Sequence, residues 1–129
     1  MIYKIKLINR LMLCGNKWKS EKILLNTLKK LQKFQKLQIN LILKSVIINN
    51  SPYFNIKQVK KKKKQIEFPF LLNKNLRISY SIKNLVNNKK NFYIDLSNSL
   101  NNKGISIDLK KKIHKDAFLK KKLANYRWF

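Results

Sequence analysis

Acidic residues are scarce in this chain. Its 5 Asp and Glu face 31 Lys and Arg, so the formal net charge is +26. A compact protein with that charge repels itself unless a polyanion neutralises it. Nucleic acid is the leading candidate, because each phosphate that pairs with a Lys or Arg releases bound counterions; an anionic membrane surface is the alternative. The basic residues are spread over the whole chain, which favours contact with folded RNA on several sides.

Residues that could perform acid–base catalysis are also scarce. The chain has one histidine, His114, and its carboxylates are scattered singly at Glu21, Glu67, Asp95, Asp108 and Asp116. Such catalysis needs two titratable groups within hydrogen-bond reach, and the neighbouring His114 and Asp116 project from different sides of a helix. We therefore predict no catalytic residue and interpret His114 as facing solvent or RNA.

Cysteine and glycine are equally rare. The single cysteine, Cys14, excludes an internal disulfide and a zinc framework built on several cysteines. The two glycines, Gly15 and Gly104, are too far apart to form a glycine-rich loop around a phosphate. The sequence therefore predicts neither a metal site nor a cofactor.

Long apolar runs are absent as well. The apolar-rich stretch 23–48 is interrupted by lysines at Lys29, Lys30, Lys33, Lys36 and Lys44, so no segment reaches the length of a membrane span. The N-terminus shows neither a secretory core nor an Arg/Ser-rich transit peptide. With 129 residues, of which 44% are hydrophobic, the sequence predicts one domain over residues 1–129 with its own core.

The choice among similar residue types is strongly biased. Lysine replaces arginine almost everywhere, and Asn, Ile and Leu are abundant. Glycine and alanine occur only at Gly15, Gly104, Ala117 and Ala124. Residues with A/T-rich codons have replaced those with G/C-rich codons, as in many organellar genomes. We therefore expect a protein made inside an organelle, with the mitochondrion as first choice and the plastid as the alternative.

Apolar periodicity predicts three helices in the first part of the chain. The first covers 3–13, with Ile5, Ile8, Leu11 and Met12 on one stripe before the turn at Gly15. The second begins at an N-cap, Ser20, and buries Leu24, Leu28, Leu31 and Phe34. The third covers 39–49, with Leu43, Val46 and Ile47 inward. The join at 35–39 lacks Gly and Pro, so one long helix is also possible there.

A β-hairpin is predicted after Ser51-Pro52. Residues 53–59 and 65–71 are rich in aromatic and β-branched residues, and five lysines, 60–64, separate them. Pro69 suits an edge strand. Five adjacent like charges repel one another unless phosphates lie beside them, so we expect this tip to contact RNA.

Three further helices complete the predicted fold. The fourth covers 73–88, with Leu76, Tyr80, Ile82 or Lys83, and Leu85–Val86 near the core. The fifth covers 92–102 and is closed by Gly104. The last covers 108–125, capped by Asp108, with an inward stripe of Leu109, Ile113, Ala117 or Phe118, and Leu123–Ala124. The predicted fold class is therefore mainly α: a small helical bundle of about six helices with one protruding β-hairpin arm.

The chain closes on an aromatic and basic segment. Tyr126, Trp128 and Phe129 either pack the last helix onto the body or stack on exposed bases, as aromatic side chains do in RNA recognition. Arg127, between them, can bridge phosphates or stack. We expect Tyr126 to pack on the body while Arg127 and Trp128 face RNA.

Several motifs, in order, resemble those of one known family, universal small-subunit ribosomal protein seven. They are Leu7–Met12 with Gly15-Asn16-Lys17, Asn49 with Pro52, the arm Val59–Pro69, the helix Arg77–Val86, Asn102-Lys103-Gly104, and the ungapped closing pattern His114, Ala117, Ala124, Tyr126, Arg127 and Trp128. The closing pattern is the most specific. The chain departs from the family at Lys62-Lys63, where two glycines are usual, at 87–91, which is short, and at Asn125, a histidine in the family.

The resemblance implies a small helical body with a protruding β-ribbon, which agrees with the elements predicted above. It also implies binding to small-subunit rRNA in its 3′ major (head) domain, beside neighbouring head proteins. The arm would lie near the exit-site tRNA and the mRNA path. Early binding during subunit assembly is a further implication.

The candidate rRNA-binding residues are the basic side chains of these segments, with one aromatic. They are Arg10, Lys17, Lys22, Lys57, Lys60, Lys61, Lys62, Lys63, Lys64, Arg77, Lys110, Lys111, Lys112, Lys121, Arg127 and Trp128. Two other classes remain open from composition: a DNA-compacting organelle protein, and a membrane-surface protein that uses the basic helix at 20–38. A hydrolase is the least favoured class, and no membrane partner is expected.

Overall fold

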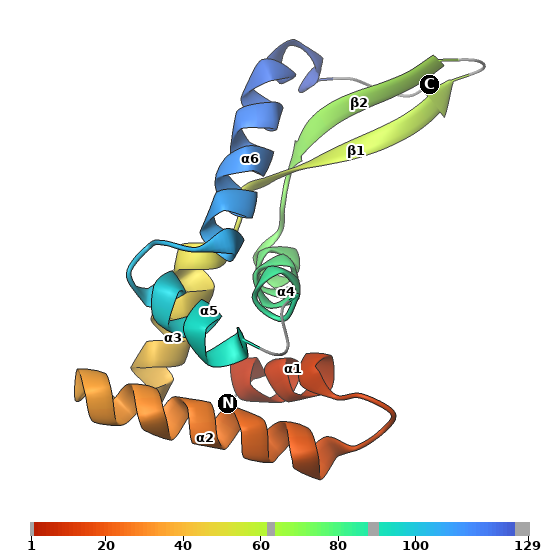
Figure 1. Cartoon of the computed structure of the whole chain (residues 1–129). Helices are drawn as coiled ribbons and strands as arrows, with labels where there is room; N and C mark the ends of the chain where they lie inside the picture. The colour runs from red at the N-terminus through yellow and green to blue at the C-terminus, as the bar shows by residue number, and fades with distance from the viewer. Residues whose placement is uncertain (1, 62–63, 88–90, 126–129) are drawn as a thin grey trace.

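The computed structural model describes residues 2–61, 64–87 and 91–125. Within them, a helical body carries a two-stranded antiparallel arm, and the arm and the last helix extend from the same end of the body (Figure 1). The elements are α1 (Ile2–Leu11), α2 (Lys17–Gln35), α3 (Ile39–Asn50), β1 (Phe54–Lys61), β2 (Lys64–Leu71), α4 (Lys74–Leu85), α5 (Phe92–Leu100), α6 (Ile105–Leu119) and the 3₁₀ turn η2 (Lys121–Leu123). The predicted fold class is confirmed.

Helix α2 begins earlier than the sequence predicted. Its N-cap is Asn16, whose side chain accepts a hydrogen bond from the Lys19 backbone N–H at 3.3 Å. The predicted cap, Ser20, is wrong: it lies inside the helix, buried, and its hydroxyl donates to the Lys17 carbonyl at 2.7 Å. Gly15 has a φ of 75° and turns the chain just before Asn16. The helix begins directly after this turn, so Asn16 occupies the N-cap position.

Helix α2 ends at a residue with left-handed backbone. Lys36 has a φ of 53°, and its N–H donates to the Gln32 carbonyl at 2.8 Å. This turn separates α2 from α3, so the single long helix is excluded. The prediction that Phe34 is buried is wrong, since 84% of it is exposed. The 3.6-residue period turns Phe34 away from the line through Leu24, Leu28 and Leu31, which are buried.

The core lies where α3 meets α1, α2, α4 and α5. Leu43, Val46 and Ile47 of α3 are buried, as predicted. On α1, Ile8 and Leu11 are buried, and Met12, just beyond its end, is half-buried, whereas Ile5 is 56% exposed and its predicted inward position is wrong. The other members of the core cluster are Leu7, Leu24, Leu28, Leu31, Ile42, Ile82, Leu85, Val86, Phe92 and Leu96.

Helix α4 approaches α3 closely enough to need a small polar side chain. Ser81 is fully buried, and its hydroxyl donates to the Ile47 carbonyl of α3 at 3.0 Å. Leu76, predicted near the core, is 46% exposed. Ile78 packs against the core cluster instead, since it shares a face with Ile82 and Leu85 at a spacing of three to four residues.

The arm is regular over its described length. Phe54 pairs with Leu71 and Lys61 with Lys64, so the strands extend into the predicted five-lysine tip and residues 62–63 connect them. Pro69 pairs with Ile56 in a sheet of two strands, where every strand is an edge, as predicted. The arm is also braced, because β1 packs on α6 and β2 on η2 (Figure 1), and Lys120 forms an ion pair with Glu67.

The last helix differs from its prediction at both ends. It begins after Gly104, whose φ of 94° favours glycine, so the expected N-cap Asp108 lies in its first turn instead. It ends at Leu119 and continues as η2, not as one helix to 125. Ala117 is buried as predicted, but Phe118 is 71% exposed. Leu123 and Ala124 are also exposed, because the 3₁₀ turn changes the face that they present.

Candidate RNA-binding surface

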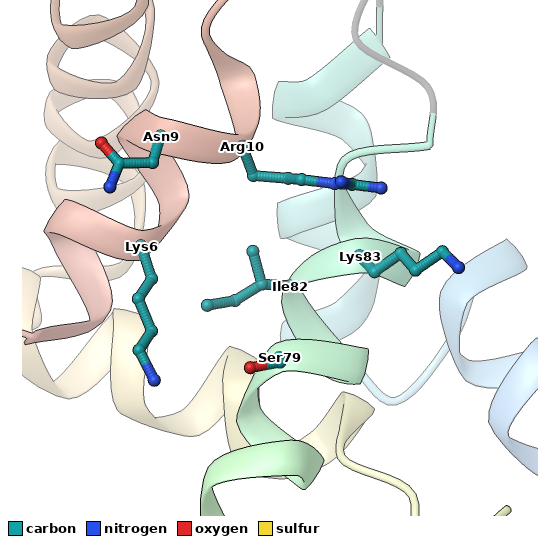
Figure 2. Close-up of a pocket in the computed structure, with 6 residues that line it drawn as sticks. All are labelled: Lys6, Asn9, Arg10, Ser79, Ile82 and Lys83. Carbon is teal, nitrogen blue, oxygen red and sulfur yellow. The ribbon is translucent and has the colours of Figure 1, made fainter.

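A basic cleft lies between α1 and α4 (Figure 2). Lys6, Asn9 and Arg10 line it from α1, where a spacing of three and four residues places them on one face. Ser79 and Lys83, also four residues apart, line it from α4. The cleft has a volume of about 440 Å³.

The cleft has three cationic side chains and no acidic one. Arg10 and Lys83 are exposed and Lys6 is half-buried. Buried Ile82 lies between the two helices, with Lys6 on one side of it and Arg10 and Lys83 on the other (Figure 2). The chain could not neutralise all its cations internally, because 31 basic residues face 5 acidic ones. Phosphate oxygens are the ligands that this arrangement fits best.

The predicted binding residues are distributed over several faces. Arg10 lies in the cleft, and Lys17 and Lys22 are exposed at the start of α2. Exposed side chains on the arm, α6 and η2 are those of Lys57, Lys60, Lys64, Lys111, Lys112 and Lys121. The side chain of Lys61 and the whole of Lys62, Lys63, Arg127 and Trp128 lie outside the described part, as do Tyr126 and Phe129. The described cations therefore offer several separate surfaces.

Two predicted residues belong to the joint between arm and body. The guanidinium carbon of Arg77 lies 3.9 Å from the ring centroid of Tyr53, just before β1. The ammonium of Lys110 donates to the Asn49 carbonyl of α3 at 2.8 Å. Burial lowers the pKa of Lys110, and the neighbouring Arg77 charge lowers it further, while Tyr53 opposes this. These two cations already hold partners within the protein.

His114 packs within the same joint. Its Nε2 accepts a hydrogen bond from the Tyr53 backbone N–H at 3.0 Å, and its ring meets that of Phe54 edge-on at 5.8 Å. The expectation that it faces solvent or RNA is therefore wrong: the half-buried imidazole joins α6 to the start of β1. Burial lowers the pKa of His114, and the Lys110 charge lowers it further.

Acid should weaken this joint. Only neutral imidazole accepts the Tyr53 hydrogen bond. Because the folded-state pKa of His114 lies below its ordinary value of 6.5, its contribution to stability is complete above pH 6.5 and is lost as pH falls toward the folded pKa. We expect His114→Ala to lower the free energy of unfolding by about 1 kcal/mol at neutral pH and to remove this pH dependence. Urea unfolding between pH 5 and about 8 measures both; an unchanged pH profile in the variant would contradict the assignment.

Comparison with known proteins gives the chain its family. A family model described as ribosomal protein S7p/S5e matches residues 3–121. The chain belongs to this family. No curated protein sequence matches it significantly. An S7-type protein is a component of the small ribosomal subunit that binds rRNA and other ribosomal proteins, and it is not an enzyme.

Family membership confirms the resemblance that the ordered motifs suggested, and it favours the ribosomal class over DNA compaction and membrane-surface binding. Among the described residues, no helix is both long and apolar enough to cross a bilayer. The cationic cleft and the arm are thus surfaces of an rRNA-binding protein, which explains the charge of +26.

Most of the cleft was missed by sequence reasoning. Lys6, Asn9, Ser79 and Lys83 were not among the predicted rRNA-binding residues. A signal existed in each helix, because Lys6 and Arg10, like Ser79 and Lys83, are spaced by one helical turn. That signal could show two polar faces, but not that α1 and α4 place them opposite each other.

Proposed function

We propose that this S7-type protein binds and organises the 3′ major (head) domain of the small-subunit rRNA and supports translation and subunit assembly. The observation that carries the proposal is the acid-free cleft between α1 and α4, lined by Lys6, Arg10 and Lys83. Its cations lie on two packed core helices, so a bound RNA strand would be held in a fixed orientation to the whole body.

The arm supplies the second part of the proposal. Lys57, Lys60 and Lys64 are exposed on its strands, which lead to residues 62–63. The His114–Tyr53 hydrogen bond holds its base and the Lys120–Glu67 ion pair braces it midway along its length, so the arm can carry these charges away from the body. We propose that it reaches the exit-site tRNA and mRNA path, beside neighbouring head proteins.

The remaining predicted contacts and the compartment are proposals on the same basis. The other proposed rRNA contacts are Lys17, Lys22, Lys61, Lys62, Lys63, Arg77, Lys110, Lys111, Lys112, Lys121, Arg127 and Trp128. Arg77 and Lys110 also hold the arm's joint within the protein. The A/T-rich codon bias supports our proposal of a mitochondrial ribosome, with the protein encoded by the organelle, and a plastid ribosome is the alternative.

A competition experiment tests the head assignment. The full chain is mixed with three competitors of equal length: the 3′ major domain transcript, the 5′ domain transcript of the same rRNA, and duplex DNA. We expect the 3′ major domain to compete best at every salt concentration. Equal competition by all three would show that the binding is only electrostatic and independent of sequence, and would overturn the proposal. Finding the native protein only free of ribosomes would also overturn it.

A further inference from the structure

A second exposed surface, with both aromatic and basic side chains, lies on the outer face of α2, away from the cleft. Trp18, Lys22, Leu25 and Lys29 recur at intervals of three to four residues and form one stripe. The buried residues of the helix lie on the opposite side: Ser20, Leu24, Leu28 and Leu31. No residue of this stripe lines the cleft between α1 and α4. Any RNA that the stripe binds must therefore meet the protein at a second place.

Trp18 is the unusual member of the stripe. Its side chain is large and apolar, yet 69% of the residue is exposed. The Lys22 ammonium lies 4.9 Å from the centroid of its ring, close enough for a cation–π contact that restrains the indole. Trp18 is not part of the core cluster, so its ring is available to a ligand.

A shallow pocket lies against this indole. Trp18, Glu21, Lys22, Leu25, Asn26 and Lys29 line it, and its volume is about 210 Å³. This is smaller than the roughly 300–1,000 Å³ of pockets for drug-sized ligands. Its lining offers an aromatic surface, a carboxylate acceptor, an amide that donates and accepts, and two cations. A planar, polar-edged ring beside a phosphate matches all of these.

We propose that this pocket binds one unpaired RNA base, stacked on Trp18, while Lys22 and Lys29 contact the flanking phosphates. Aromatic stacking on splayed-out bases is a common means of single-stranded RNA recognition. Glu21 and Asn26 line the same pocket and would meet the edge of the base. A protein partner is disfavoured, because exposed Lys17, Lys19 and Lys22 lie within four residues of Trp18 on the helix, Lys29 lines the pocket, and Glu21 is the one acid among the lining residues.

The test compares Trp18→Ala with a matched control, Phe34→Ala. Phe34 is an exposed aromatic at the other end of the same helix and lines none of the pockets described above. The probes are a fluorescent, unpaired RNA oligonucleotide and a duplex RNA of the same length. We expect Trp18→Ala to weaken single-strand binding about 5- to 100-fold, with little change for the duplex. Trp18→Phe should keep most of the affinity, and Phe34→Ala all of it.

Salt dependence separates stacking from charge. Trp18→Ala removes no cation, so the slope of log K against log salt should stay unchanged, whereas Lys22→Gln should reduce it by about 0.7. Equal losses on duplex and single strand, or no loss at all, would overturn the proposal. The inference rests on RNA binding but not on the head domain, because the competition among transcripts tests that assignment with wild-type protein.

Discussion

Phe92→Ala should lower the free energy of unfolding by about 3–5 kcal/mol. Phe92 is only 2% exposed and is the largest of the fully buried side chains among the described residues. It begins α5, and its ring belongs to the hydrophobic core cluster that this helix shares with α1, α2, α3 and α4. Truncation removes its apolar burial and leaves a cavity that these helices cannot close together. A domain of this size has a free energy of unfolding of only about 5–15 kcal/mol, so this loss is a large fraction of the total.

The matched control is the next residue, Tyr93, which is 37% exposed. Tyr93→Ala removes an aromatic ring from the same helical turn but not from the core, and should cost less than about 1 kcal/mol. Urea unfolding of both variants, at equal salt so that charge repulsion is screened alike, measures the difference. If the two variants lose similar amounts of unfolding free energy, Tyr93 on the outer face of α5 stabilises the fold as much as Phe92 does. That result would contradict the burial of Phe92 in the core.

The parts of the fold that the sequence predicted well are those set by local pattern. Helix α3 was predicted within one residue at its end, with Leu43, Val46 and Ile47 inward, because these residues follow the helical period and the face that they form is the one that is buried. The arm was predicted because two segments rich in aromatic and β-branched residues flank the lysine run. Both features can be read from short stretches of sequence.

The errors lie where tertiary arrangement decides. Phe34, Leu76 and Phe118 were each assigned to an inward face or near the core, but each is exposed. Periodicity identifies a face, whereas burial depends on what covers that face. Ser20 and Asp108 are good cap residues by type, yet the turns at Gly15 and Gly104 start both helices earlier.

The candidate site was predicted even less completely, for the same reason. Charge and motif order indicated RNA, and Arg10 was among the predicted residues. The partners of Arg10 across the cleft come from α4, far away in sequence. His114 shows the reverse error, since a residue predicted to face solvent or RNA holds the start of the arm through Tyr53. The sequence could not show this contact, because its backbone partner lies 61 residues earlier in the chain.

Removing the cleft's three charges should have the largest effect on RNA binding. In the triple variant Lys6→Gln, Arg10→Gln and Lys83→Gln, we expect affinity for the 3′ major domain transcript to fall about 100-fold, since each lost phosphate contact costs roughly 5-fold. The slope of log K against log salt should fall by about 2 to 3. Filter binding over a series of salt concentrations measures both quantities.

A second triple variant separates the cleft from net charge. Lys33, Lys44 and Lys103 are exposed and line none of the pockets described above, and their replacement by Gln lowers the net charge from +26 to +23, as the cleft variant does. If only overall charge matters, the two variants lose affinity equally, and the cleft is not a binding site. Urea unfolding of both variants checks whether loss of the fold explains a larger loss of affinity in the cleft variant. Because fewer repelling cations should leave the free protein as stable as before or more so, weaker binding together with undiminished stability would identify the cleft as an RNA contact.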